Sequence, residues 1–242
     1  MNAALIFAGG TGQRMNTRSV PKQFLQLHNK PIIVYTLEQF NEHPEIDAIV
    51  IACLESHIDY MKKLDDHFDL HKVKAVVPGG KTGQESIYNG LSAIKELCTA
   101  SGEDPVVLVH DGVRPLIDQD TITACLRCVE QHGNAVTVVP AQETIVADCR
   151  DGLVGNIMAR NRCSMARAPQ CFYLSDLLKC HSQAIAQGRS DFIDSASLMQ
   201  FYGHDVYTVE GKMENIKITT PMDFYIFRAL ADARENSQIF GI

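Results

Sequence analysis

Apolar residues along this chain follow two alternating patterns. Short, nearly continuous apolar runs, typical of strands that are buried on both faces, alternate with longer segments in which apolar residues recur every three or four positions, typical of helices. The apolar runs lie at 3–7, 48–52, 74–77, 106–110 and 135–139. The helical patterns lie near 31–42, 55–66, 84–97 and 119–132. This alternation predicts an α/β, Rossmann-like fold: a mostly parallel sheet with helices on both faces.

The last third of the chain continues with less regular patterns. Helical patterns lie near 174–187 and 194–202, apolar runs near 205–209 and 215–218, and a last helical pattern begins at Pro221. No internal repeat, low-complexity tract or linker separates these segments from the first half. We therefore expect one domain over residues 1–242.

The segment from about 140 to 163 interrupts the rhythm of strands and helices. It contains Asp151-Gly152, a dipeptide typical of tight hairpin turns, between two β-type stretches. We expect this segment to form a β-hairpin arm that protrudes from the main sheet. Because an isolated hairpin is only marginally stable in water, we also expect the arm to pack against a second subunit and build a homodimer.

Charge and composition limit the classes of function. The 242 residues carry a formal net charge of −7, which argues against a protein that coats nucleic acid or lies on a membrane surface. No apolar run approaches the roughly 18 residues of a membrane span. The first residues lack the basic segment of a secretory signal peptide. We therefore expect a cytoplasmic protein with neither a nucleic acid nor a membrane as partner.

The first apolar run ends in a glycine-rich loop. Ala8-Gly9-Gly10-Thr11-Gly12 follows it, then Arg14, and Lys22 comes eight residues after that arginine. Because glycine has no Cβ, backbone N–H groups in such a loop can approach a phosphate closely. A glycine-rich loop alone is a weak signal, but one followed by two cations favours a nucleoside triphosphate as ligand.

Two further polar loops follow apolar runs. Residues 78–86 contain Gly79-Gly80 and Ser86, and His110-Asp111-Gly112-Val113-Arg114 ends another run. Ligands of open parallel sheets bind at the carboxyl ends of strands, where all three loops are expected. Taken singly, each has a structural explanation; Asp111 could cap a turn, and Arg114 could simply pair with it. Together the three loops favour a site for phosphate chemistry.

Nucleotidyl transfer suits these residue types. A phosphate oxygen attacks the α-phosphorus of a nucleoside triphosphate and pyrophosphate leaves, so the enzyme has to position two substrates and neutralise negative charge. Arginine, lysine and Mg²⁺ do this, and a single aspartate can hold the metal. We therefore expect Mg²⁺ as the cofactor.

The order of these motifs resembles one family over nearly the whole chain. The three loops are followed by Ala168-Pro169-Gln170 and Asn215-Ile216-Lys217. The chain is similar to the CTP-dependent cytidylyltransferases of polyol phosphates, whose acceptors include ribitol 5-phosphate and 2-C-methyl-D-erythritol 4-phosphate. The resemblance implies transfer of CMP from CTP to a short polyol phosphate, in a homodimer joined through the arm.

The resemblance also implies roles for individual residues. The catalytic cations at the α-phosphorus are Arg14, Lys22 and Lys217. The residues that hold CTP are Ala8, Gly9, Gly10, Thr11, Gly12, Gly80 and Ser86. On the acceptor side lie Asp111, Arg114, Thr144 and Arg160, and Asp111 is also the expected metal ligand. Arg160, expected on the return strand of the arm, reaches the acceptor's phosphate across the dimer.

The acceptor side departs from the family pattern. Ala168 and Ile193 stand where the family commonly has threonine, which removes two hydroxyl groups. The Gly-Gly-Thr-Gly loop and the spacing from Arg14 to Lys22 favour ribitol 5-phosphate as acceptor, with 2-C-methyl-D-erythritol 4-phosphate second. A non-catalytic nucleotide-binding homologue is an alternative that the two lost hydroxyls permit.

A nicotinamide-dependent oxidoreductase is the other alternative, because Gly10-Thr11-Gly12 follows the first strand. That class needs a third glycine, at the position where this chain has Met15. It also needs an acidic residue about twenty positions on, at the end of the second strand, whereas here the second apolar run ends far later.

Overall fold

The structure is a computed structural model that describes residues 1–10, 20–99 and 102–240, with side chains described as far as residue 236. Thr11, Gly12 and Arg14 of the predicted nucleotide loop therefore lie outside the described residues. No helix in the described part of the chain combines the length and the apolar character needed to cross a bilayer.

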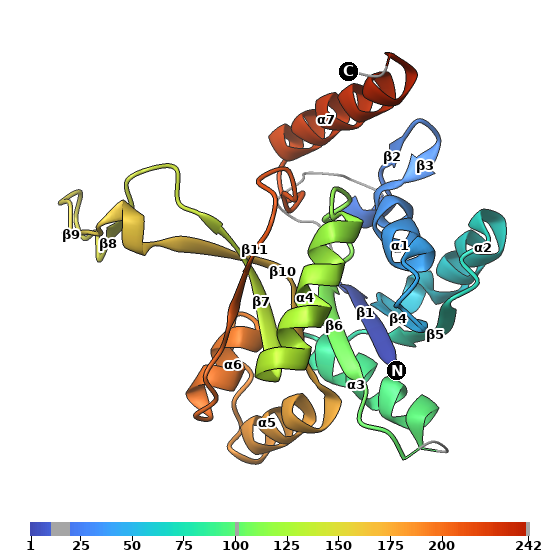
Figure 1. The fold of residues 1–242 in the computed structure, drawn as a ribbon, viewed down its shortest axis with the longest axis horizontal. Coiled ribbons are helices and arrows are strands. Elements are labelled where there is room, and N and C mark those ends of the chain that lie inside the picture. The colour runs from blue at the N-terminus through green and yellow to red at the C-terminus, as the bar shows by residue number, and fades with distance from the viewer. Residues whose placement is uncertain (11–19, 100–101, 241–242) are drawn as a thin grey trace.

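A twisted sheet forms the centre of the molecule (Figure 1). Across the described residues its seven strands run in the order β11-β7-β10-β6-β1-β4-β5. Their bounds are β1 (Asn2–Ala8), β4 (Ala48–Cys53), β5 (Val73–Pro78), β6 (Val106–Asp111), β7 (Asn134–Pro140), β10 (Ser164–Tyr173) and β11 (Thr208–Glu210). Only β10 among them runs against the others. The expected mostly parallel, Rossmann-like sheet is confirmed.

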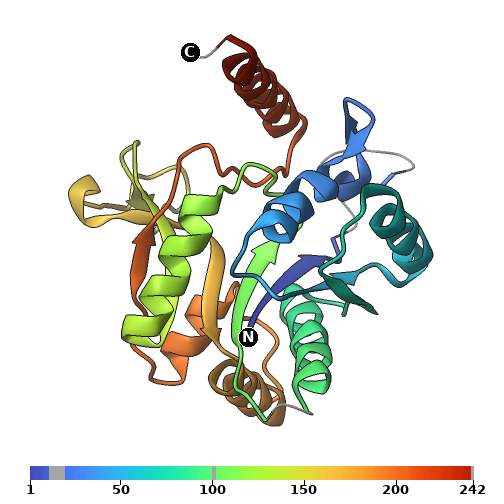
Figure 2. The same ribbon diagram turned by 45° about the vertical axis from the view of Figure 1, so that its right-hand side comes forward.

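Helices cover both faces of the sheet (Figure 2). One face packs against α1 (Ile32–Glu42), α2 (Ile58–Phe68) and α4 (Gln119–His132), and the other against α3 (Gly83–Cys98), α5 (Leu174–Ala186) and α6 (Ser195–Phe201). In β1, Ala4 and Ile6 face the first group, whereas Ala3 and Leu5 face the second. Burial on both faces explains why this strand is apolar from Ala3 to Ala8.

The C-terminal helix α7 (Pro221–Phe240) projects beyond the sheet at the top of Figure 1. Phe227 anchors it to a separate apolar cluster with Val113 and Ile218. Nearby lie the short hairpin of β2 (Gln26–Leu27) and β3 (Lys30–Pro31) and the 3₁₀ helix η2 (Lys22–Phe24), while a second 3₁₀ helix, η3 (Glu55–His57), leads into α2. This cluster brings the segment after Ile218 against the loop after β6.

The arm protrudes from the left side of the sheet in Figure 1. It carries β8 (Val146–Ala147) and β9 (Asn156–Ile157), paired antiparallel. Asp151 and Gly152 have φ of 52° and 78°, the positive values that a type I′ hairpin turn needs. The hairpin is confirmed, but the expectation that Arg160 lies on its return strand is wrong: it begins the 3₁₀ helix η4 (Arg160–Arg162).

In the second half, one strand was not predicted and two expected strands differ from the structure. The ten-residue strand β10 was not predicted, because Arg167 and Pro169 interrupt its apolar pattern and the pairing with β7 shifts between Ala166 and Gln170. The expected strand at 215–218 is a loop. Near 205–209, regular pairing is confined to β11, which begins at Thr208.

α3 packs so closely against β1 that a single added methyl group should destabilise the fold. A Cβ on Gly90 would lie 2.1 Å from Leu5 Cδ1. We expect Gly90→Ala to cost about 3 kcal/mol by overpacking, of which helix propensity returns about 1 kcal/mol. Thermal unfolding followed by circular dichroism should show a melting temperature lower by about 4–8 °C.

Gly83→Ala in the same helix is the matched control, because a Cβ there meets nothing within 4 Å. Its melting temperature should stay unchanged or rise slightly. Equal effects of the two substitutions would contradict the packing argument.

Candidate active site

The register of the sheet brings the polar loops to one edge. Phe7 of β1 pairs with Asp111 of β6, and Ala8 pairs with Cys53 of β4, which in turn pairs with Pro78 of β5. The loops that follow β1, β5 and β6 therefore start at the same level. This confirms that the glycine-rich loop, the Gly79-Gly80 loop and the Asp111 loop share one edge.

A buried carboxylate lies at the centre of this edge. Asp111 Oδ2 accepts a hydrogen bond of 2.7 Å from Arg114 Nε, and Asp111 Oδ1 lies 2.6 Å from Lys217 Nζ. Burial raises the pKa of Asp111, but the two cations and their hydrogen bonds outweigh it and lower the pKa to about 2. The carboxylate is therefore ionised at neutral pH and holds two cations in fixed positions.

The segment that carries Lys217 is held by side chains. Arg114 Nη1 donates to the Asn215 carbonyl at 3.0 Å, and Lys22 Nζ donates to the Ile218 carbonyl at 3.0 Å. The Ile218 N–H donates to the Val113 carbonyl. Because these carbonyls accept hydrogen bonds from side chains instead of from a neighbouring strand, the segment is a loop rather than the expected strand. The same bonds bring Lys22 and Lys217, from opposite ends of the chain, to one place.

A cavity of about 240 Å³ lies between Asp111 and the glycine-rich loop after β1. We call this the nucleotide side of the site, because the sequence assigned the residues of this loop to CTP. The walls of the cavity include Ala8, Gly9, Gly10, Lys22, Gly80, Ser86, Asp111 and Lys217. The structure thus brings together the described residues that the sequence assigned to CTP and two of the three cations that it assigned to catalysis. The third, Arg14, lies outside the described residues.

Ser86 organises the loops of this cavity. Its Oγ accepts from the Gly80 N–H at 3.0 Å and donates to the Thr82 carbonyl at 2.9 Å. A Cβ on Gly9 or Gly79 would lie 3.0 Å from the same oxygen, so glycine at both positions allows the loops to close on it. Ser86 is buried, and its hydroxyl is engaged with the protein rather than presented to a ligand.

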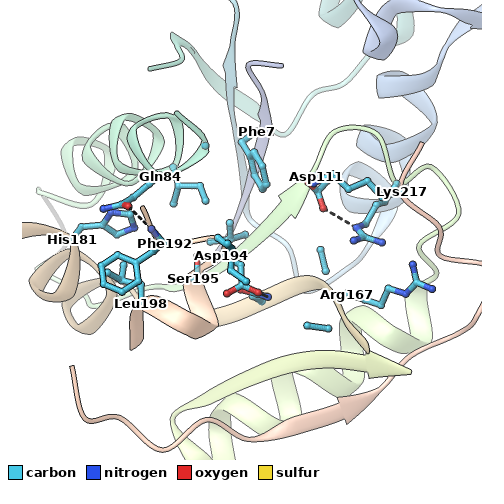
Figure 3. Close-up of a pocket in the computed structure, with 18 residues that line it drawn as sticks. Phe7, Gln84, Asp111, Arg167, His181, Phe192, Asp194, Ser195, Leu198 and Lys217 are labelled. Atoms are coloured by element: carbon cyan, nitrogen blue, oxygen red, sulfur yellow. Dashed lines mark hydrogen bonds and ion pairs between the residues drawn. The ribbon is translucent and has the colours of Figure 1, made fainter. Parts of the chain in front are cut away.

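A second cavity, of about 300 Å³, lies on the other side of Asp111 and Lys217 and shares both residues with the first (Figure 3). We call it the acceptor-side cavity. Ala168 is buried in its wall, whereas the Ile193 side chain stands at its rim, 91% exposed. The two residues that replace the family's threonines therefore both border this cavity.

Arg167, the cation beside Ala168, lines the acceptor-side cavity, and burial together with the charge of Arg114 lowers the pKa of Arg167. The polar residues of this cavity that were not assigned to the site from the sequence are Gln84, His181, Asp194 and Ser195. These residues lie in or beside helical patterns that indicate only packing against the sheet. Of these five residues, Arg167 was therefore the only one whose position in the sequence, beside Ala168, pointed to the acceptor side.

Two predicted acceptor residues lie away from both cavities. Thr144 and Arg160 are exposed on the arm, and Arg160 Nη1 donates to the Gln142 carbonyl at 3.1 Å. Neither residue lines either cavity. Within one subunit the structure therefore does not bring them to Asp111.

Asp111 could provide only part of the ligands of a metal ion. Each oxygen of Asp111 already contacts a cation, and no group of three metal-binding side chains surrounds it among the described residues. In the described part of the chain, one group of three such side chains exists elsewhere: His28, Asp232 and Glu235. It joins the β2–β3 turn to α7. A Mg²⁺ ion beside Asp111 would take most of its oxygen ligands from bound phosphates.

Comparison with known proteins supports a nucleotidyltransferase site. A ribitol-5-phosphate cytidylyltransferase of Vibrio parahaemolyticus is 52% identical over 241 residues, with both chains fully covered. A 2-C-methyl-D-erythritol 4-phosphate cytidylyltransferase of Clostridium botulinum is 38% identical over 93% of this chain and 95% of its own. These names give no support to a nicotinamide-dependent oxidoreductase.

The fold agrees with the sequence matches. The crystal structure of 4-diphosphocytidyl-2C-methyl-D-erythritol synthase from Anaerococcus prevotii superposes with a TM-score of 0.81, covering 96% of each chain at 24% identity. The family model described as IspD, 2-C-methyl-D-erythritol 4-phosphate cytidylyltransferase, matches residues 2–233. The chain therefore belongs to the IspD family of cytidylyltransferases.

Proposed function

We propose that this protein transfers CMP from CTP to ribitol 5-phosphate and releases pyrophosphate. The observation that carries the proposal is the pair of cavities that meet at Asp111 and Lys217, one with the glycine-rich loop and one on the opposite side. Two cavities that share a wall of fixed charges suit a reaction between two bound phosphates. Ribitol 5-phosphate is favoured because the relative named for it is 52% identical.

The chemistry follows from the charges at the junction. A phosphate oxygen of the acceptor attacks the α-phosphorus of CTP, and the bond from that phosphorus to the oxygen of pyrophosphate breaks. Lys22 and Lys217, with Arg14, neutralise the negative charge that concentrates at the α-phosphorus. The acceptor phosphate is already a competent nucleophile, so the protein needs no strong base.

Asp111 acts in this proposal mainly as a positioning residue. Its two oxygens hold Lys217 Nζ and the Arg114 guanidinium, which fixes both cations before the substrates bind. A cation held in advance costs no reorganisation when the charge develops. Mg²⁺ bound to the triphosphate, with Asp111 as its protein ligand, would add further neutralisation of charge.

The arm is proposed to complete the site of a second subunit. It exposes Leu153, Val154 and Ile157, at 73%, 67% and 67%, an apolar surface that a dimer would cover. Arg160 and Thr144 lie at the same arm and line neither cavity of their own chain. In a symmetric dimer, they would reach the acceptor's phosphate in the partner's site.

The direct test is pyrophosphate release with CTP and Mg²⁺, with ribitol 5-phosphate and 2-C-methyl-D-erythritol 4-phosphate offered in parallel. We expect turnover with ribitol 5-phosphate at a kcat/KM well above that of the other acceptor. The reverse preference would overturn the choice of acceptor. CTP binding without release of pyrophosphate from CTP, whichever polyol phosphate is offered, would support the non-catalytic homologue.

Lys22→Ala should lower kcat by about 10²–10³-fold, the loss found when one donor to a transition-state charge is removed. The KM for CTP should change little, because the charge of Lys22 is used most in the transition state. Steady-state pyrophosphate release checks this, with Lys63→Ala on the exposed face of α2 as control. A raised KM with unchanged kcat would instead show that Lys22 binds ground state and transition state equally.

Arg160→Ala should raise the KM for the acceptor and leave the KM for CTP unchanged. If Arg160 acts in the partner's site, co-expressed Arg160→Ala and Lys22→Ala chains should recover activity, since one site of each mixed dimer has both native residues. About one quarter of wild-type activity is expected from random pairing. No recovery in dimers shown to be mixed by mass spectrometry would place Arg160 in its own subunit's site.

Asp111→Asn should destabilise the protein by about 3–5 kcal/mol, because it leaves the buried Arg114 cation without its partner. In wild type the folded pKa of Asp111 is about 2, below the unfolded value of about 3.9, so its contribution is full above about pH 4 and is lost as pH falls towards 2. Urea unfolding at a series of pH values should show this acid loss in wild type and a smaller one in the variant. Asp191→Asn, which removes an exposed pair with Arg189, is the control and should leave stability nearly unchanged.

A further inference from the structure

Two buried polar side chains in the acceptor-side cavity lack partners. His181 of α5 and Ser195, the first residue of α6, are each 2% exposed. Neither ring nitrogen of His181, nor the Oγ of Ser195, has a hydrogen-bond partner among the described residues. Because a buried polar atom without a partner costs free energy, such atoms beside a cavity point to a ligand that completes them.

The neighbouring polar groups are already engaged. Gln84 Nε2 donates to the Arg189 carbonyl at 3.0 Å, and Gln84 Oε1 accepts from the Phe192 N–H at 3.3 Å. Gln170 Nε2 donates to an Asp194 carboxylate oxygen at 3.0 Å. Arg167 Nε also lacks a hydrogen-bond partner among the described residues, but Arg167 lies at the Lys217 side of the cavity in Figure 3. At the opposite side, His181 and Ser195 are the groups that remain for a ligand.

Their chemistry matches an alcohol. Burial lowers the pKa of His181 to about 4, so its imidazole is neutral and offers one donor and one acceptor. The hydroxyl of Ser195 also donates and accepts. Phe192 and Leu198 line the same part of the cavity with apolar surface. Such surroundings suit uncharged hydroxyl groups and disfavour a second phosphate or a carboxylate.

The positions match the direction in which the acceptor has to extend. In Figure 3, Asp111 and Lys217 lie at one side of the cavity, His181 lies at the other, and Ser195 lies between them. The acceptor's phosphate has to lie at the Lys217 side, where the nucleotide cavity begins. Its carbon chain then extends towards Ser195 and His181.

We propose that Ser195 and His181 determine acceptor specificity by hydrogen bonding to the hydroxyl groups of the polyol that lie farthest from its phosphate. The inference rests on the proposed function. These groups would supply polar contacts on the side of the site where Ala168 and Ile193 provide no hydroxyl. His181 also borders a cavity of about 280 Å³ beside Tyr88, so Ser195 is the sharper residue to test.

The test is a double-mutant cycle between protein and substrate. Ser195→Ala and His181→Leu are assayed with ribitol 5-phosphate and with its analogue that lacks the hydroxyl farthest from the phosphate. Each variant should raise the KM for ribitol 5-phosphate about tenfold while the KM for CTP stays constant. At least one variant should no longer distinguish the two acceptors, whereas wild type distinguishes them. His181→Asn, which keeps a donor and an acceptor, should recover part of the loss.

Ser182→Ala is the matched control, because Ser182 lies on α5 beside His181 but is exposed and donates to the Leu178 carbonyl. Melting temperatures show whether each variant folds. Variants that are folded and still discriminate between the acceptors as wild type does would overturn the inference. If wild type turns over only 2-C-methyl-D-erythritol 4-phosphate, the proposed acceptor fails, and the same cycle with that acceptor and its deoxy analogue then tests the two residues.

Discussion

The site depends on one buried negative charge. Asp111 ends a central strand, where burial alone would make its carboxylate unfavourable, and Arg114 and Lys217 compensate by contacting one oxygen each. Arg114 also binds the carbonyl of Asn215, so the same cluster fixes the loop that supplies Lys217. A charge that must be paired thus forces segments far apart in the sequence into one position. The arrangement of the candidate site is a consequence of that pairing.

The precision of the nucleotide side comes from the sheet and from Ser86. Parallel pairing places the ends of β1, β4, β5 and β6 at one level, and Ser86 binds the loop after β5 while nearly touching the glycine loop. A side chain at Gly9 or Gly79 would press on its hydroxyl. Glycine at these two positions therefore lets both loops close on the Ser86 hydroxyl.

The two sides of the site differ in how they are built. The nucleotide side uses backbone and lysine, which suit phosphates in general, whereas the acceptor-side cavity carries the features particular to this chain: Arg167, Ala168, and polar groups on α5 and α6. Thr144 and Arg160 of the arm lie outside both cavities of their own chain, which is why we propose that they act in the site of a partner subunit. Differences in acceptor among relatives of this fold are thus expected to arise on the acceptor side and on the arm.

The sequence by itself determined the fold class and most of the nucleotide side. Apolar runs buried on both faces and helical periodicity predict the parallel strands and their helices, and the glycine loop and Asp111 follow directly from strand ends. Strand β10 could not be predicted because Arg167 and Pro169 interrupt its apolar pattern. Residues 215–218 form a loop because Arg114 and Lys22 donate hydrogen bonds to carbonyls of this segment. The meeting of Lys22 with Lys217, and the unpaired state of His181 and Ser195, were decided only by tertiary structure. Periodicity reports which face of an element is buried, but only the folded chain determines which groups share a cavity and which of them have a partner.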